Sequence, residues 1–153
     1  MNQTVGIRRA VPADAAALQE LLDGCVGGSM DDVGRWLSAP DVYTYLSEVD
    51  HPFGTVTVGP HELDDRSGEV LAWVVAPGYQ ARGYGRKLLV HGMTVLKRRQ
   101  YEKAAIWISV EAERAAVIGG QLGFEVVGAE KVINVSGGSR VFLLYEADLA
   151  QFF

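Results

Sequence analysis

A glutamine and two glycines, Gln80, Gly83 and Gly85, stand close together where an apolar segment gives way to a helix-like one. Glycine allows a backbone with positive φ and lets a ligand approach the main-chain amides closely. The first turn of a following helix has unpaired N–H groups and a partial positive charge, which together suit phosphate or diphosphate. Arg82 and Arg86 would add positive charge beside it. The segment is therefore a candidate anion-binding loop.

The letters around the loop exclude two common nucleotide motifs. A P-loop requires Gly-Lys-Ser or Gly-Lys-Thr, but Gly85 is followed by the letters RKL. A dinucleotide fingerprint requires G-x-G-x-x-G, and residue 88, where the third glycine would stand, is leucine. The pattern that remains is Q-x-x-G-x-G, preceded by an apolar segment that ends in the letters VAP at residues 75–77.

Hydrophobic periodicity predicts the elements that position this loop. Strands are expected at residues 5–9, 42–49, 53–59, 69–76, 104–110, 124–133 and 140–147, and helices at residues 12–24, 29–40, 84–99 and 112–121. The polar segment 60–68 is expected to form a loop. This order predicts one domain over residues 1–153 of the α/β (α+β) class. Its mixed, mostly antiparallel sheet of about seven strands contains one parallel pair and has helices on both faces.

The composition is that of an ordinary globular domain and argues against several kinds of partner. Hydrophobic residues make up 48% of the 153 residues and charged residues 22%. No apolar stretch approaches the roughly 18 residues of a membrane span, and a net charge of −5 argues against binding nucleic acid. The single cysteine, Cys25, is interpreted as a small apolar residue. A lone cysteine and no signal peptide together predict a cytoplasmic protein.

The loop and its surroundings resemble one family of enzymes. The pattern Q-x-x-G-x-G after V-x-P is similar to the coenzyme A pyrophosphate loop of the GNAT superfamily of acetyl-CoA-dependent N-acetyltransferases. The resemblance extends from the letters IRRAVPADAAALQELL to the final pair of strands and includes the Gly-Phe at residues 123–124. It implies a GNAT-like fold, acetyl-CoA as the cofactor, and transfer of an acetyl group to a primary amine of a small molecule or a protein.

The resemblance also implies which residues bind the cofactor. The backbone of Trp73, Val74 and Val75 would pair with the pantetheine arm, while the Trp73 side chain is expected to pack in the core. The loop would hold the pyrophosphate, mostly through main-chain amides, and its cofactor-binding residues are Gln80, Ala81, Arg82, Gly83, Tyr84, Gly85 and Arg86.

Glu69 is the candidate catalytic residue. An amine is mostly protonated at neutral pH, so a base must accept a proton before the amine attacks a thioester. Glu69 precedes the apolar run 70–75 and stands eleven residues before Gln80. This spacing is similar to that of the catalytic glutamate in the histone-type branch of the superfamily. The alternative is that Glu69 is a solvated strand end.

Two positions depart from the family pattern. Many relatives carry an asparagine and a tyrosine where this sequence has Ala112 and Gly119, and that tyrosine often protonates the leaving thiolate. A second hypothesis is therefore a non-catalytic acyl-CoA-binding regulatory module of the same fold. A third is a nucleotide-binding domain. The identity of the acceptor amine stays open.

The remaining polar residues do not indicate a second site. His51, His61 and His91 are isolated and are expected in loops or at the surface, with His61 the one that could lie near an acceptor. The acidic residues of segment 60–68 lack metal-ligand spacing, so no metal is expected. The strand order also allows a homodimer through the C-terminal edge strands.

Overall fold

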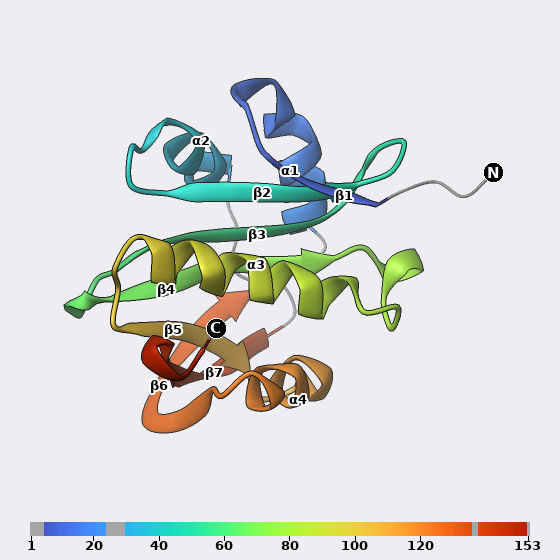
Figure 1. Ribbon diagram of the computed structural model, residues 1–153. Coiled ribbons are helices and arrows are strands. Elements are labelled where there is room, and N and C mark those ends of the chain that lie inside the picture. The colour runs from blue at the N-terminus through green and yellow to red at the C-terminus, as the bar shows by residue number, and fades with distance from the viewer. Residues whose placement is uncertain (1–4, 24–29, 136–137, 153) are drawn as a thin grey trace.

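The computed structural model describes residues 5–23, 30–135 and 138–152 (Figure 1). Two features of the sequence, Cys25 and the expected helix start at Ser29, lie outside these residues. No helix within the described ranges is both long enough and apolar enough to cross a membrane.

Seven strands form one sheet in the order β1-β2-β3-β4-β5-β7-β6. The strands are β1 (Gly6–Arg9), β2 (Tyr43–Glu48), β3 (Pro52–His61), β4 (Asp64–Val75), β5 (Lys103–Ser109), β6 (Glu125–Val135) and β7 (Gly138–Asp148). Neighbouring strands are antiparallel except β4 and β5, which are parallel because helix α3 (Tyr84–Arg98) crosses over between them. The predicted mixed sheet with a single parallel pair is confirmed.

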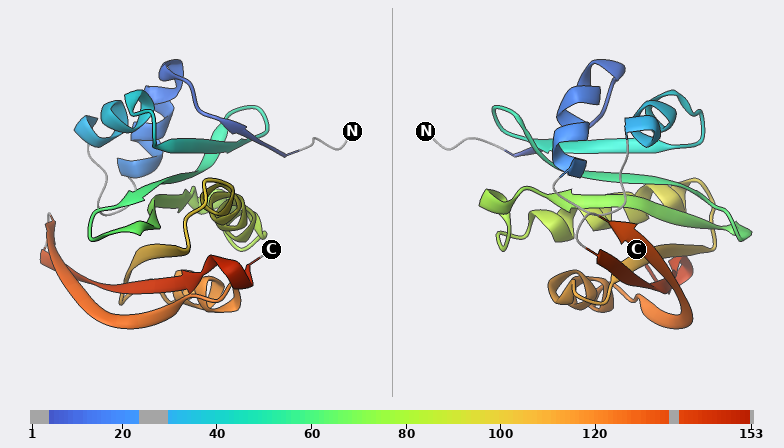
Figure 2. Two further views of the ribbon diagram at one scale, coloured as in Figure 1. Left: turned by 60° about the vertical axis from the view of Figure 1, so that its left-hand side comes forward. Right: turned by 180° about the vertical axis from the view of Figure 1, so that it is seen from behind.

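Helices cover both faces of the sheet (Figures 1 and 2). The helices are α1 (Ala15–Asp23), α2 (Met30–Ser38), α3 (Tyr84–Arg98) and α4 (Glu113–Gln121), with short 3-10 turns at Pro12–Asp14, Pro77–Tyr79 and Leu149–Gln151. One core cluster lies under α1 and α2, and a larger one lies under α3 and α4. The sheet is therefore buried on both faces at its centre, as the near-continuous apolar run of β4 predicts.

The buried face of α3 follows the predicted helical spacing. Leu88, Leu89, Met93 and Leu96 are each exposed by 1% or less. Gly92 lies on the same face, and a Cβ there would approach Val56 and Val58 of β3 to 3.0 Å. The helix therefore packs against the sheet closely enough to fix where its first turn stands.

The expectation of a loop at residues 60–68 is wrong. Strands β3 and β4 continue through this segment as a hairpin whose last register pair is His61 with Asp64. The side chains near the hairpin end are polar because most of them are exposed, whereas Ser67 and Gly68, closer to the core, are buried. Backbone pairing extends the strands beyond the hydrophobic core, and an apolar pattern cannot reveal that extension.

Candidate active site

Strands β4 and β5 pair over a short distance and then separate. Their parallel register runs from Ser67 with Lys103 to Val70 with Ile106. On the other side of β4, Val58 pairs with Val70 while Thr57 pairs with Ala72, so the intervening Leu71 forms a β-bulge. A bulge bends its strand and disrupts the local ladder. After Val70, the edge of β4 that faces β5 therefore has no strand partner.

A cavity of about 370 Å³ lies where the two strands separate. One wall comes from β4, the other from β5, β6, β7 and the start of α4, with Leu22 and Trp36 added by the first two helices. Its lining includes Glu69, Leu71, Ala72, Trp73, Val74, Trp107, Ile108, Glu111, Ala112, Lys131, Arg140 and Phe142. A mostly apolar cavity with a few polar groups is typical of a small-molecule site.

Glu69 lies in the wall of this cavity and is paired with a histidine. The side chains of His61 and Glu69 are only 4% and 13% exposed, and 2.6 Å separates His61 Nδ1 from Glu69 Oε1. Because a carboxylate only accepts hydrogen bonds, the pairing assigns the ring proton to Nδ1. No described residue hydrogen-bonds to Oε2 of Glu69. The carboxylate is thus held through one oxygen while the other is available.

The position of His61 corrects the prediction of a loop or surface residue. Its side chain is buried because β3 extends further than the sequence pattern indicated. His91 also differs from that prediction. It lies within α3, half-buried, with its ring 4.3 Å from that of Tyr45. Burial lowers the pKa of His91 below its usual value.

The loop before α3 has the geometry of an anion site. Ala81 and Gly83 both have positive φ, 64° and 87°. The first helical hydrogen bond runs from the Lys87 N–H to the Gly83 carbonyl, so the amides of the first turn have no helical acceptor. The Gln80 side chain donates to the Val75 carbonyl at 3.0 Å and closes the loop onto the end of β4. The loop therefore leads into the N-terminus of a 15-residue helix, which is suited to binding an anion.

The glycines of this loop fit a diphosphate. A Cβ added at Gly83 would meet nothing within 4 Å, and one at Gly85 would make only ordinary contacts at 3.7–3.8 Å. Internal packing therefore does not require glycine at either position. Positive φ explains Gly83, whereas the lack of a side chain at Gly85 leaves the backbone open to close approach by a ligand.

The side chains at the loop have mixed roles. The Trp73 indole packs beside the core and donates to the Gly85 carbonyl at 2.8 Å, which ties β4 to the first turn of α3. Tyr84 packs against Phe53. Arg86 donates to Gln121 of α4 at 2.6 Å, and Arg82 is exposed with its guanidinium 5.9 Å from the Tyr79 ring. Of the two predicted loop arginines, Arg86 thus already has a polar partner.

Not every predicted residue lies in the same cavity. Trp73 and Val74 line both the cavity between the separated strands and a neighbouring cavity beside α1, whereas Val75 and Gln80 line only the second. Two features were missed by sequence reasoning: the pairing of His61 with Glu69, and the cations Lys131 and Arg140 in the opposite wall. No local pattern marks either one, since each depends on strand register.

The sequence matches the acetyltransferase (GNAT) family over residues 17–119. A search among curated proteins gave no match. Many solved structures are similar, among them Arabidopsis thaliana NAA60 in complex with acetyl-CoA, at a TM-score of 0.83 and 12% identity over 96% of this chain and 99% of that one. Another is yncA from Salmonella typhimurium with its cofactor acetyl-CoA, at 0.81 and 22% identity over 95% and 94% of the two chains.

A third similar structure is the ribosomal-protein-S18-alanine N-acetyltransferase from Escherichia coli, with a TM-score of 0.81 and 14% identity over 95% and 94% of the two chains. At these identities the solved structures establish a shared fold. The family match covers most of the chain, including the separated strands, Glu69 and the loop before α3. The chain therefore belongs to the acetyltransferase (GNAT) family.

Proposed function

We propose that residues 1–153 form one N-acetyltransferase domain that moves an acetyl group from acetyl-CoA to a primary amine of a small molecule or a protein. The amine would attack directly while both reactants are bound. The observation that carries this proposal is the carboxylate of Glu69, held by His61 at one oxygen, in the cavity between the separated strands. One similar structure is by name an N-acetyltransferase of a protein alanine, which agrees with an amine acceptor.

The family's cofactor is acetyl-CoA, as the sequence resemblance implied. When bound, it supplies the acetyl thioester. The amides of residues 81–86 and the N-terminus of α3 would hold its diphosphate. The edge of β4 from Leu71 to Val75 has backbone groups without a strand partner and would pair with the pantetheine amides. The residues of this chain therefore fit the cofactor at both its charged and its extended parts.

Glu69 is the proposed base. Oε1 accepts from His61, so Oε2 would take a proton from the incoming ammonium directly or through a water molecule. His61 is then a positioning residue, because it fixes the direction of the carboxylate without itself lining the cavity. Burial of both side chains keeps competing water away from this pair.

A second candidate function, the non-catalytic acyl-CoA-binding module, is favoured by one observation. No tyrosine or histidine is among the residues that line the cavity within the described ranges. Gly119 is buried against Ile108 and Phe124, and Ala112 precedes α4 without a side-chain cap. In the enzyme, the leaving thiolate would therefore take its proton from solvent. In the module, no thiolate would be released.

Release of free thiol from acetyl-CoA, measured with a panel of primary amines, tests the proposal. Glu69→Gln is expected to lower kcat by about 10²–10⁴-fold with little change in the KM for acetyl-CoA, because the substitution removes the base and leaves the loop intact. His61→Gln should lower kcat less, because the base remains but loses its support. Glu102→Gln, an exposed glutamate outside the cavity, is the matched control.

Three results would count against the proposal. Cofactor binding by calorimetry without turnover of any amine would favour the regulatory module. Unchanged kcat in Glu69→Gln would remove Glu69 as the base. Thermal stabilisation by ATP or NAD but not by acetyl-CoA would favour the nucleotide-binding alternative. A cytoplasmic location and a homodimer stay predictions from the sequence.

A further inference from the structure

Two cations lie in the cavity wall that faces β4. Lys131 comes from β6 and Arg140 from β7, and both line the cavity. In the register of these strands Lys131 pairs with Phe142 and Ile133 pairs with Arg140. Lys131 and Arg140 are therefore diagonal neighbours on one face of the hairpin, at a spacing of about 7–8 Å between such positions. Their charges act on the same part of the cavity.

These cations are only partly compensated. Arg140 donates to Glu111 through Nη1, but its Nε is buried and has no hydrogen-bond partner among the described residues. The Lys131 ammonium lies 4.6 Å from the centre of the Trp107 ring, and no carboxylate in the described ranges pairs with it. Of the two cations, Arg140 thus pairs with one carboxylate, Glu111, and the two side chains of this pair are 41% and 67% exposed, while Lys131 is exposed. The wall has spare positive charge and a spare N–H donor.

The rest of the cavity separates this wall from Glu69. Glu69 stands on β4 at the closed end of the opening, where it still pairs with Ala105 of β5, and His61 lies beside it on β3. Apolar side chains, including Ile108 and Phe142, lie around the space between them. One face of Trp107 is already covered by Lys131, so that face is closed to a cationic ligand. The charges are thus arranged for a molecule with a cationic amine at one end and an anion at the other.

We propose that the acceptor is a small amine that also carries a carboxylate, of the α-amino acid type. Its carboxylate is bound by Arg140 and Lys131 while its amine faces Glu69. A guanidinium and an ammonium together match a carboxylate well, since arginine binds it through paired N–H groups. A polycationic acceptor would meet like charge at the same wall. This inference rests on the proposed function and names its acceptor.

The transfer balances with these groups. The amine nitrogen forms the new bond to the acetyl carbon, and the bond from that carbon to sulfur breaks. The ammonium's first proton passes to Glu69, and its second leaves the nitrogen as the bond from carbon to sulfur breaks. Solvent delivers one proton to the thiolate and takes up the other, which Glu69 releases, so the products are an N-acetyl amino acid and coenzyme A as its thiol, with no oxidant or reductant. Arg140 and Lys131 take no part in the proton transfer, so they are specificity residues.

Matched acceptors test the inference. Each of the twenty common α-amino acids is compared with its α-amide, which keeps the amine and side chain but lacks the carboxylate, and with its decarboxylated amine where one exists. For the best amino acid, kcat/KM is expected to exceed that of its amide by about 10²-fold or more, because the amide leaves the charged donors of the site unpaired.

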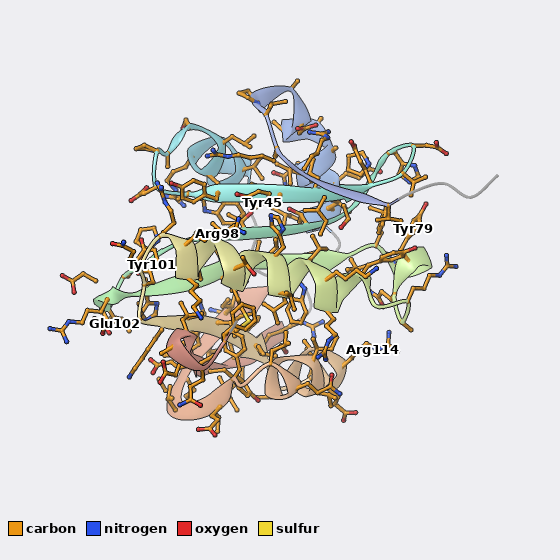
Figure 3. The ribbon with its side chains drawn as sticks, in the orientation of Figure 1. Tyr45, Tyr79, Arg98, Tyr101, Glu102 and Arg114 are labelled. Carbon is orange, nitrogen blue, oxygen red and sulfur yellow. The ribbon has the colours of Figure 1, made fainter. Side chains whose placement is uncertain are left out.

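Two variants locate the effect. Arg140→Gln and Lys131→Met are each expected to raise the KM for the amino acid by about tenfold or more and to reduce the preference for the amino acid over its amide, with the KM for acetyl-CoA unchanged. Arg98→Gln is the control, an exposed arginine at the end of α3 far from the loop that holds Tyr79 (Figure 3). The rise in the melting temperature of the wild-type protein when the amino acid is added measures binding without turnover and without a variant.

The outcomes separate this inference from the proposed function. Amides or plain amines acetylated as well as amino acids would overturn the inference and leave the enzyme intact. With no turnover of any amine, the enzyme proposal fails. In that case amino acids that stabilise the wild type but not Arg140→Gln still support the anion site, and amino acids that stabilise neither protein overturn it. If Arg140→Gln does not fold, the inference is tested with Lys131→Met and with the melting temperatures of the wild-type protein in the presence of amino acids.

Discussion

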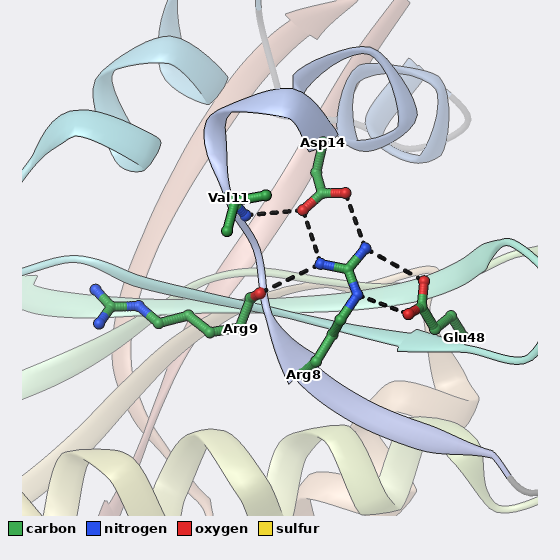
Figure 4. Close-up of polar contacts among 5 residues, drawn as sticks. All are labelled: Arg8, Arg9, Val11, Asp14 and Glu48. Carbon is green, nitrogen blue, oxygen red and sulfur yellow. Dashed lines mark hydrogen bonds and ion pairs between the residues drawn. The ribbon is translucent and has the colours of Figure 1, made fainter.

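At the level of single residues, Arg8 forms ion pairs with two carboxylates that come from different parts of the fold (Figure 4). Its guanidinium donates to both carboxylate oxygens of Asp14 at 2.9 Å and through Nε to Glu48 at 2.6 Å. Asp14 also accepts the Val11 N–H at 2.7 Å, which closes the turn before α1. These bonds join β1, β2 and the 3-10 turn that precedes α1. They lower the pKa of Asp14, chiefly through the hydrogen bonds from Arg8, and raise the pKa of Arg8.

Asp14→Asn is expected to lower the free energy of unfolding by about 1–3 kcal/mol at neutral pH, since it breaks a charge-assisted fork. The pKa of Asp14 is lower in the folded state than its usual 3.8, so its stabilisation is present above that value. It is lost as the pH falls through the folded-state pKa. Urea denaturation at neutral pH and near pH 3 measures the difference, which should shrink in acid. Asp65→Asn, an exposed aspartate, is the control, and an equal difference at both pH values would contradict the assignment.

At the level of elements, the connection from β4 to α3 contains residues with positive φ, and hydrogen bonds hold it to both β4 and the first turn of α3. Gly83 has a left-handed backbone just before the helix, and Ala81 shares that conformation without being glycine. The bonds from Gln80 to Val75 and from Trp73 to Gly85 hold the loop at both ends. The first turn of α3 is thereby fixed relative to the edge of β4. A diphosphate and an extended arm could then be bound together.

Gly85→Ala separates ligand binding from folding. The added methyl group would make only ordinary contacts with Val75 and Trp73, and alanine favours a helix by up to about 1 kcal/mol over glycine. The melting temperature should stay equal or rise, while the Kd for acetyl-CoA by calorimetry should increase about tenfold, because the methyl group obstructs close approach to the amides. Gly83→Ala should instead lower stability through its positive φ.

Gly34→Ala is the matched control for these variants, because a Cβ there would meet nothing within 4 Å and the helix α2 lies away from the loop. If Gly85→Ala bound acetyl-CoA as tightly as wild type, the assigned contact with the diphosphate would be wrong. If it lost stability instead, the glycine would serve packing.

At the level of the whole molecule, the sheet consists of two parts joined by a short seam. Strands β1 to β4 form one part and β5, β7 and β6 the other, and the parallel pairing of residues 67–70 with residues 103–106 connects them. Helix α3 covers this seam (Figure 1). Gly68 lies in it, and a Cβ there would stand 2.4 Å from Leu96 Cδ2. The two parts are therefore joined at a seam that is tightly packed against α3.

Gly68→Ala should lower the free energy of unfolding by about 1–3 kcal/mol, because the methyl group overpacks the contact between the seam and α3. Urea denaturation followed by circular dichroism measures the change. Gly120→Ala, where a Cβ would meet nothing within 4 Å, is the control. Equal stability of Gly68→Ala and wild type would mean that Leu96 can turn away freely, which a core side chain exposed by only 1% should not do.

Local signals were enough to predict much of this protein. The starts of the helices, the apolar face of α3 and the loop motif at residues 80–85 all depend on residues within a few positions of each other, and the structure confirms the order of elements. Glu69 was predicted from its place before an apolar strand and from a spacing to the loop that resembles the family's histone-type branch, and it does line the cavity. The polar end of the β3–β4 hairpin was mistaken for a loop, since exposed strand residues give no apolar alternation.

The sequence by itself determined the order of elements and the candidate anion-binding loop, because periodicity and glycine chemistry act over short stretches of chain. Only the tertiary structure decided what surrounds the acceptor. His61 meets Glu69 through the register of β3 with β4, and Lys131 comes beside Arg140 through the register of β6 with β7. Shifting either register by one residue would turn these side chains to the opposite face of the sheet, and the sum of packing across the whole sheet sets that register.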